Sequence, residues 1–269
     1  MAIARANPQL SAGGVRYPAT HTLSYAVPSG NDRVLVVRGH FLDHAAGNPG
    51  PDFAVTVTYN GVAMTQAATA TGSSVNRRIR VHLWYLINPP VGTANIVVTF
   101  PDQADDSMAS STLFAVTLTG VKQVAPTGAT ANSSGNPTNS LALTGCAAES
   151  LILAAVVSDG TGPPSWVWTT ATEEYDGSYG DSTILGGHTG AYYTVPSAGN
   201  VTLTATRNAT ATGPGQVGIA VEFLIAVDEP VDVELNTLTL TAAAIGLSVI
   251  PGAVARVLDL LVADIAVQP

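Results

Sequence analysis

The sequence V-H-L-W-Y-L-I-N-P-P-V-G-T-A-N-I-V-V-T-F, residues 81–100, decides the fold class of this chain. Apolar residues alternate with other residues on both sides of its centre, N-P-P-V-G at residues 88–92. This is the pattern of two β-strands joined by a tight turn, because proline cannot pair within a central strand and glycine suits the turn. We therefore predict a β-hairpin here.

A second stretch repeats this pattern. In A-Y-Y-T-V-P-S-A-G-N-V-T-L-T-A-T, residues 191–206, Pro196 occupies the position of Pro89 and Gly199 that of Gly92, so that the offset is 107 residues at both positions. A constant offset is most simply explained by an internal duplication.

Alternating runs separated by turn signals fill the first half of the chain. Asn60-Gly61 between two such runs is the strongest short-range hairpin signal. Seven strands in close succession with no segment of helical period favour an antiparallel sandwich. The predicted strands are residues 21–27, 33–41, 53–59, 62–66, 81–87, 92–100 and 111–121.

The second half follows the same order of strands after a Pro/Asn/Ser/Gly-rich stretch at residues 125–139, but it lacks a counterpart of the Asn60-Gly61 hairpin. We favour a single jelly-roll-like body over residues 16–228, and two tandem sandwiches remain the alternative. The related halves are residues 16–121 and 137–228. The predicted fold class is therefore all-β, an antiparallel, jelly-roll-like β-sandwich built from two related halves.

The two ends of the chain differ from this body. Residues 1–15 are polar and glycine-rich without strand or helix period, so we predict an N-terminal arm. Residues 229–269 contain an apolar pattern that repeats after about 18 residues, and we predict a C-terminal β-repeat extension. Two such repeats cannot bury their own apolar faces, which indicates an assembly contact, with a trimer preferred. The predicted contact residues are Leu238, Leu240, Ile245, Leu247, Val249, Leu258, Leu260, Ile265 and Val267.

Composition excludes several classes of protein. Charged residues are only 11% of the chain, the net charge is −9 and Lys122 is the single lysine, so we expect no nucleic-acid partner. The single cysteine, Cys146, allows neither an intrachain disulfide nor a cysteine-based zinc site. The longest apolar run, residues 242–255, is shorter than the roughly 20 residues of a spanning helix, and we predict no membrane segment.

Two clusters of potential metal ligands stand out, although neither has the spacing of a known metal motif. His40, Asp43 and His44 lie together at the end of a predicted strand, where a solvated loop is the plainer interpretation. A glycine-containing loop holds enough oxygen ligands for calcium, but without EF-hand spacing. These ligands are Glu173, Glu174, Asp176, Ser178 and Asp181. We predict no bound metal or cofactor.

No arrangement of residues indicates catalysis. Serine occurs in no G-x-S-x-G motif, and no phosphate-binding glycine loop opens a helix, so we predict that the chain is not an enzyme. His82 alternates with Trp84, and Trp166 with Trp168, so either pair could form an aromatic platform for a sugar. Burial in the sandwich core is the plainer interpretation of these tryptophans.

The chain resembles β-rich virion proteins of tailed bacteriophages, in particular capsid decoration (cement) proteins and head fibres. The resemblance rests on V-T-Y-N-G, W-Y-L-I-N-P-P-V-G-T, T-L-T-G-V and the terminal L-T-L-T-A-A-A-I-G-L-S-V-I-P-G-A-V-A. It implies a structural role, commonly as a trimer bound to the major capsid protein or another virion protein. Similar sequence motifs occur in carbohydrate-binding modules.

Two functions are therefore expected as alternatives. The first is a virion protein that binds and stabilises a phage shell through buried contact area. The second is a glycan-binding adhesin or carbohydrate-binding module. The start of the sequence has no apolar core of an export signal, which favours synthesis in the host cytoplasm and incorporation into the virion.

Overall fold

The computed structural model describes residues 2–13, 20–43, 55–74, 77–100, 108–135, 137–159, 165–180, 185–208 and 215–226. They belong to the first of two compact units, Met1–Val227, whereas the second unit, Asp228–Pro269, lies outside the described residues. The regular structure is antiparallel β throughout, which confirms the predicted fold class. Within the described ranges, no helix is long and apolar enough to cross a membrane.

The first half forms a jelly roll, called roll 1 below. Its inner sheet has the order β1-β9-β3-β7-β6 and its outer sheet the order β2-β8-β4-β5. The pairing is nested, β1 with β9, β2 with β8, β3 with β7 and β4 with β5, as in a rolled-up hairpin. The strands are β1 (Ala4–Gly13), β2 (Thr20–Val27), β3 (Val34–Asp43), β4 (Thr56–Tyr59), β5 (Val62–Ala63), β6 (Thr65–Ser74), β7 (Arg77–Ile87), β8 (Gly92–Thr99) and β9 (Met108–Thr119).

The second half, roll 2, repeats this topology. Its inner sheet has the order β10-β17-β12-β15-β14 and its outer sheet β11-β16-β13, so each strand of roll 1 except β5 has a counterpart. The strands are β10 (Thr127–Gly135), β11 (Thr138–Cys146), β12 (Leu151–Asp159), β13 (Trp166–Thr169), β14 (Thr172–Gly180), β15 (Leu185–Thr194), β16 (Gly199–Arg207) and β17 (Gln216–Phe223). This correspondence supports the duplication inferred from the sequence.

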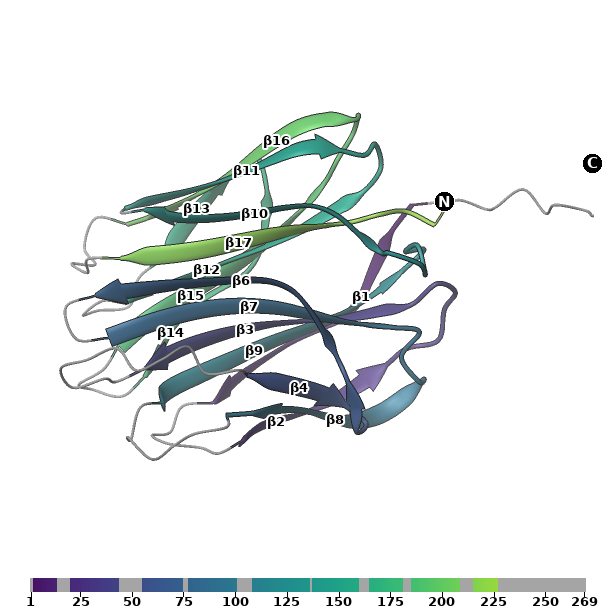
Figure 1. The fold of residues 1–269 in the computed structure, drawn as a ribbon, viewed down its shortest axis with the longest axis horizontal. Coiled ribbons are helices and arrows are strands. Elements are labelled where there is room, and N and C mark those ends of the chain that lie inside the picture. The colour runs from purple at the N-terminus through teal and green to yellow at the C-terminus, as the bar shows by residue number, and fades with distance from the viewer. Residues whose placement is uncertain are drawn as a thin grey trace, which may run out of the picture. The chain divides into compact units, whose positions relative to one another are not determined.

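The four sheets stack as layers, with the two inner sheets facing each other in the middle (Figure 1). Strands of the two rolls do not mix within a sheet. The body expected over residues 16–228 thus consists of two sandwiches that share a central core.

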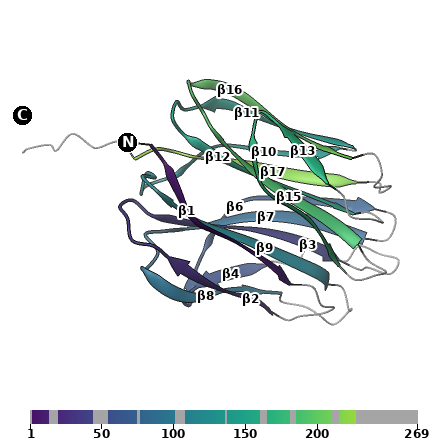
Figure 2. The same ribbon diagram turned by 180° about the vertical axis from the view of Figure 1, so that it is seen from behind.

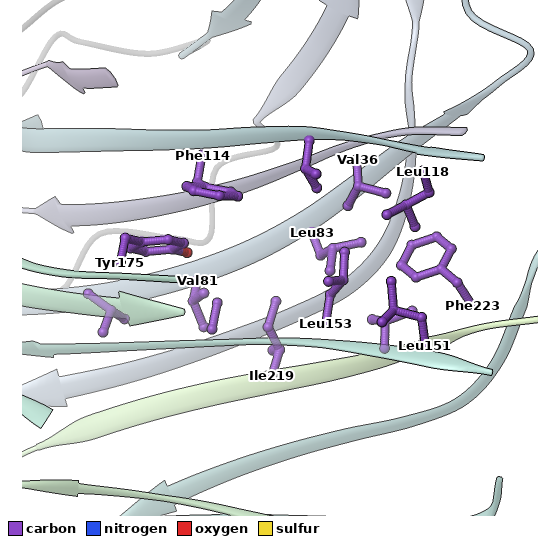
Figure 3. Close-up of a cluster of buried hydrophobic side chains, with 14 of the residues drawn as sticks. Val36, Val81, Leu83, Phe114, Leu118, Leu151, Leu153, Tyr175, Ile219 and Phe223 are labelled. Carbon is purple, nitrogen blue, oxygen red and sulfur yellow. The ribbon is translucent and has the colours of Figure 1, made fainter. Parts of the chain in front are cut away.

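The central core explains why the inner strands read as continuous apolar runs. Every residue of β12, L-I-L-A-A-V-V-S-D, is buried, because one face of its sheet packs on the outer sheet and the other on roll 1. Figure 3 shows side chains of both rolls meeting in this core. Roll 1 contributes Val36, Val81, Leu83, Phe114 and Leu118, and roll 2 contributes Leu151, Leu153, Tyr175, Ile219 and Phe223. Each such side chain stabilises the fold by roughly 1.5–3 kcal/mol.

The stretch at residues 81–100 differs from the prediction in one respect. Its two strands exist as β7 and β8, but β7 lies in the inner sheet and β8 in the outer sheet, so the predicted hairpin pairing is wrong. The connection is an arch between layers, and β15 and β16 form the same arch in roll 2. Trp84 of β7 and Ile96 of β8 belong to the same buried cluster, the core of roll 1. Alternation alone does not distinguish strands that pair from strands that pack face to face.

The predicted Asn60-Gly61 hairpin is confirmed. β4 and β5 pair antiparallel around it, with Tyr59 opposite Val62. Asn60 has φ 50° and Gly61 φ 77°, as a two-residue hairpin turn of this type requires.

The sequence prediction missed three strands and most of a fourth. β1 lies where an N-terminal arm was predicted, and β10 lies in the Pro/Asn/Ser/Gly-rich stretch at residues 125–139. β14 lies in the predicted glycine-containing loop that holds the potential calcium ligands. β6 extends well beyond its predicted end at residue 66. All four are edge strands of the inner sheets, and Figure 2 shows β1 beside β9. In β1 a register shift between Ala6 and Gln9, with Asn7 at φ 50°, interrupts the two-residue period.

Gly92 gives a test of the arch. Its φ of 115° is unfavourable for a β-branched residue, while no atom lies within 4 Å of an added Cβ, so strain comes from the backbone alone. We predict that Gly92→Val lowers the unfolding free energy by about 1–3 kcal/mol in urea denaturation. The exposed neighbour provides the control, because Val91→Ala should leave stability within about 0.5 kcal/mol. Equal stability of both variants would contradict the arch geometry.

Candidate functional site

The outward faces of the two outer sheets share a distinctive composition. In both sheets, apolar residues point inward while small and hydroxyl-bearing residues point to solvent. The exposed strand residues of outer sheet 1 are Thr20, Thr22, Ser24, Ala26, Thr56, Val62, Ala63, Gly92, Thr93, Asn95 and Thr99. Those of outer sheet 2 are Thr138, Ser140, Ala142, Thr144, Gly145, Val167, Thr169, Gly199, Asn200 and Thr202. None of these side chains is charged.

Such faces suit contact with another protein. Charged residues are depleted at the centre of protein interfaces because their desolvation is costly, whereas a hydroxyl can both donate and accept a hydrogen bond. Roll duplication places these two similar faces at opposite ends of the four-layer stack (Figure 1).

Outer sheet 1 also carries an open groove of about 560 Å³. Ser24, Thr58, Asn60 and Asn95 supply polar groups to its lining. The β4–β5 hairpin forms one wall, and β5 has no counterpart among the described strands of roll 2. The groove presents amides and hydroxyls without a charged side chain, which is a suitable chemistry for a neutral polyhydroxylated ligand.

The contact between the rolls contains a buried charged cluster. Arg38 of β3 is fully buried and forms an ion pair with Glu174 of β14, whose side chain is 2% exposed. The Arg38 Nη1 donates to the carbonyl oxygen of Ala154 at 2.9 Å, and the guanidinium lies over the Phe114 ring at 4.4 Å. Arg5 of β1 pairs with the same carboxylate. Two arginines of roll 1 thus hold one carboxylate of roll 2.

Two histidines face each other across the same contact. The ring centroids of His40 (roll 1) and His188 (roll 2) lie 5.3 Å apart, and the Nε2 of His40 lies 3.3 Å from the Tyr175 hydroxyl. Burial lowers the pKa of His188 to about 4. Burial, with the charges of His188 and Arg38 adding to it, holds the pKa of His40 well below its ordinary value. Both imidazoles are therefore neutral at neutral pH.

The candidate metal ligands that the structure describes form no metal site. His40 is buried against roll 2, and residue 44 lies outside the described residues. Of the proposed calcium ligands, Glu174 is occupied by the two arginines, and Asp176 accepts a hydrogen bond from the Trp166 backbone N–H at 3.0 Å. Residue 181 is not described. Across the described ranges, no group of three or more His, Cys, Asp or Glu side chains is arranged to hold a metal ion.

The tryptophans lie in the cores rather than on a platform. Trp84 is 1% exposed and stacks on His82 with ring centroids 5.0 Å apart. The Nε1 of Trp166 donates to Gln216 Oε1 at 3.1 Å, and that of Trp168 donates to Thr189 Oγ1 at 2.8 Å. The interpretation of these tryptophans as core residues is therefore confirmed and the alternative of a sugar platform is excluded, because all three indoles are buried and those of Trp166 and Trp168 have their N–H groups hydrogen-bonded inside the protein.

The predicted assembly residues of the C-terminal segment, from Leu238 to Val267, lie outside the described residues. Sequence reasoning missed the Arg38–Glu174 pair, because the two residues are 136 positions apart. The only available signal was a single arginine inside the apolar run V-L-V-V-R-G-H-F. No protein-family model matches the chain, and a search of the curated proteins finds no relative.

The buried ion pair predicts a strong response to removal of one partner. Glu174→Ala should lower the unfolding free energy by about 3–5 kcal/mol, because it leaves the Arg38 charge buried without its counter-ion. Glu173→Ala, at an exposed neighbouring position, should cost less than about 1 kcal/mol. Denaturant unfolding of both variants measures the difference, and equal costs would exclude the ion pair as a stabilising contact.

The histidine pair predicts a loss of stability in mild acid. An unfolded histidine binds its proton near pH 6.5, whereas folded His188 does so only near pH 4, so the unfolded state holds more protons between these values. Stability should therefore fall as the pH drops from about 6.5 to 4, by up to about 1.4 kcal/mol per pH unit for each buried histidine. Denaturant titrations across this range should show a shallower slope for His188→Gln. An unchanged slope would show that His188 does not carry the effect.

Proposed function

We propose that the chain is a non-enzymatic structural protein of a bacteriophage virion, most specifically a decoration protein that binds the outer shell and stabilises it. The observation that carries this proposal is the pair of uncharged, hydroxyl-bearing faces on the two outer sheets. The resemblance of the sequence to phage decoration proteins and head fibres supports the same role.

The stack provides a mechanism for stabilisation. A body whose two opposite faces have similar chemistry can contact two neighbouring shell subunits, and each contact favours the assembled shell by mass action. A stable contact needs about 800 Å² from each partner, which calls for a broad face rather than a small pocket. The shared central core holds the two faces at a fixed separation.

Self-assembly is part of the proposal. The apolar repeats within residues 229–269 suit a contact with sister chains, with a trimer preferred. Sedimentation of the full chain measures the copy number, and a monomer at all accessible concentrations would contradict this part.

A glycan-binding function is the second candidate, and the groove on outer sheet 1 is the observation that favours it. Asn60 and Asn95 offer donors and acceptors for sugar hydroxyls there. The burial of all three tryptophans removes the stacking surface on which the sequence-based version of this function depended.

Charge substitutions on the two faces test the decoration function. Thr22→Glu on outer sheet 1 and Thr202→Glu on outer sheet 2 should each weaken co-sedimentation with shells at least tenfold, because a carboxylate must then be desolvated. The shells are stripped particles of the phage whose genome encodes the chain. Thr172→Glu, at an exposed position of β14, is the matched control and should bind as the parent does.

Each outcome distinguishes the two functions. Loss of shell binding in the two face variants alone, with melting temperatures unchanged, supports decoration. Parent-like binding in both variants would contradict the role of the faces. Retention of one neutral glycan on a glycan array, lost in Asn95→Ala, would favour the glycan-binding function instead.

A further inference from the structure

Each inner sheet ends in an edge strand on either side of the stack. On one side, the edge strands carry charged residues and proline. There the edge strands β1 and β14 lie close enough for Arg5 to pair with Glu174. The Arg5 guanidinium also lies over the Tyr192 ring at 3.7 Å. β1 carries Pro8, and β14 carries Glu173 and Asp176. Charged residues and proline are the usual devices that prevent an edge strand from pairing with another chain.

The other side of the stack lacks these devices. The edge strands there are β6 of roll 1 and β10 of roll 2, T-Q-A-A-T-A-T-G-S-S and T-G-A-T-A-N-S-S-G, without charge or proline. A groove of about 270 Å³ separates them. Its lining is small and neutral, namely Ala67, Ala68, Thr69, Thr130, Ala131 and Asn132.

Of these two edges, β6 is the one available for pairing. Within the described residues it forms a ladder only with β7, so its second edge carries main-chain groups that face away from the sheet. The register is regular from Ala68 to Ser74 after an irregularity between Gln66 and Ala68. In β10, by contrast, the side chain of Asn139 donates to the Ser133 carbonyl oxygen at 3.3 Å.

Because the two rolls repeat one topology, β6 can be compared directly with its equivalent strand in roll 2. β6 and β14 occupy equivalent positions in the two rolls, and only β14 carries acidic residues. The absence of charge on β6 is therefore not a requirement of the jelly-roll topology.

We propose that β6 is a self-association edge, on which β6 of a second copy of this chain pairs antiparallel about a two-fold axis. The two inner sheets of roll 1 then form one continuous sheet across both chains. Each copy has a net charge of −9, so two copies approach with least repulsion where neither presents a carboxylate. This contact belongs to the described body and is distinct from the shell-binding faces and from the C-terminal segment.

The register identifies the residue that tests the contact. Thr71 is the middle residue of the regular stretch Ala68–Ser74, and it is exposed. Antiparallel pairing about a two-fold axis places the middle residue opposite its own copy. Like charges directly opposite on paired strands repel, and opposite charges attract.

The experiment uses Thr71→Lys and Thr71→Asp in the full chain. Each variant alone should sediment at a lower mass than the parent assembly, with association through β6 at least tenfold weaker, while any assembly through residues 229–269 is kept. An equimolar mixture of the two should recover the parent mass through mixed β6 pairs. The parent contact should also strengthen with added salt, because salt screens the repulsion between two acidic chains.

Thr172→Lys is the control, since it introduces the same charge at an exposed residue of β14, the strand of roll 2 equivalent to β6. It should keep the parent mass. The proposal is overturned if Thr71→Lys keeps the parent mass, if the control loses mass equally, or if the mixture does not recover. Shell binding is measured separately through Thr22 and Thr202, so failure of the β6 contact is distinguishable from failure of the decoration function.

Discussion

Burial of the two inner sheets on both faces is the constraint on which the rest of the structure depends. A sheet that is apolar on both sides needs two covers. In each roll the outer sheet supplies one cover, and the inner sheet of the other roll supplies the second. Duplication therefore does more than repeat a module, because each copy completes the core of the other. The two outer sheets are left with one solvent face each, and these are the faces proposed to bind other proteins.

The charged cluster between the rolls has a cost that the core must offset. Taking Arg38 and Glu174 out of water is unfavourable, and their mutual attraction repays this only with good geometry and further hydrogen bonds. The carbonyl oxygen of Ala154 and the ring of Phe114 provide such contacts. We interpret the cluster as a device that fixes the register of the two rolls, since an apolar contact alone would tolerate sliding. Its burial also explains why Glu174 is unavailable to a calcium ion.

The fold class and the duplication could be predicted from sequence because the buried strands carry strong alternating or continuous apolar patterns. The placement of β7 and β8 in different sheets could not be predicted, since alternation reports which residues are buried and not which strand lies beside them. The four edge strands were missed for a related reason. β6 and β10 consist mainly of small residues such as alanine, threonine and serine, and none of their described residues is fully buried, so no large apolar side chain marks an inward face in their sequence.

The candidate sites also divide into features that the sequence pattern shows and features that only the packing of the rolls creates. The exposed hydroxyl faces are the outward half of the alternation in strands such as β2 and β11, and this pattern is readable from sequence once the inward half is known. The Arg38–Glu174 pair and the His40–His188 contact join residues of different rolls. Only the packing of one roll on the other brings them together, and no local pattern encodes that packing.

Differential scanning calorimetry of the full chain most directly tests the claim that the two rolls form one cooperative body. A shared central core predicts a single transition for both rolls, with calorimetric and van't Hoff enthalpies equal. Two separate transitions, or a calorimetric enthalpy about twice the van't Hoff value, would show that the rolls unfold independently. That result would contradict the account.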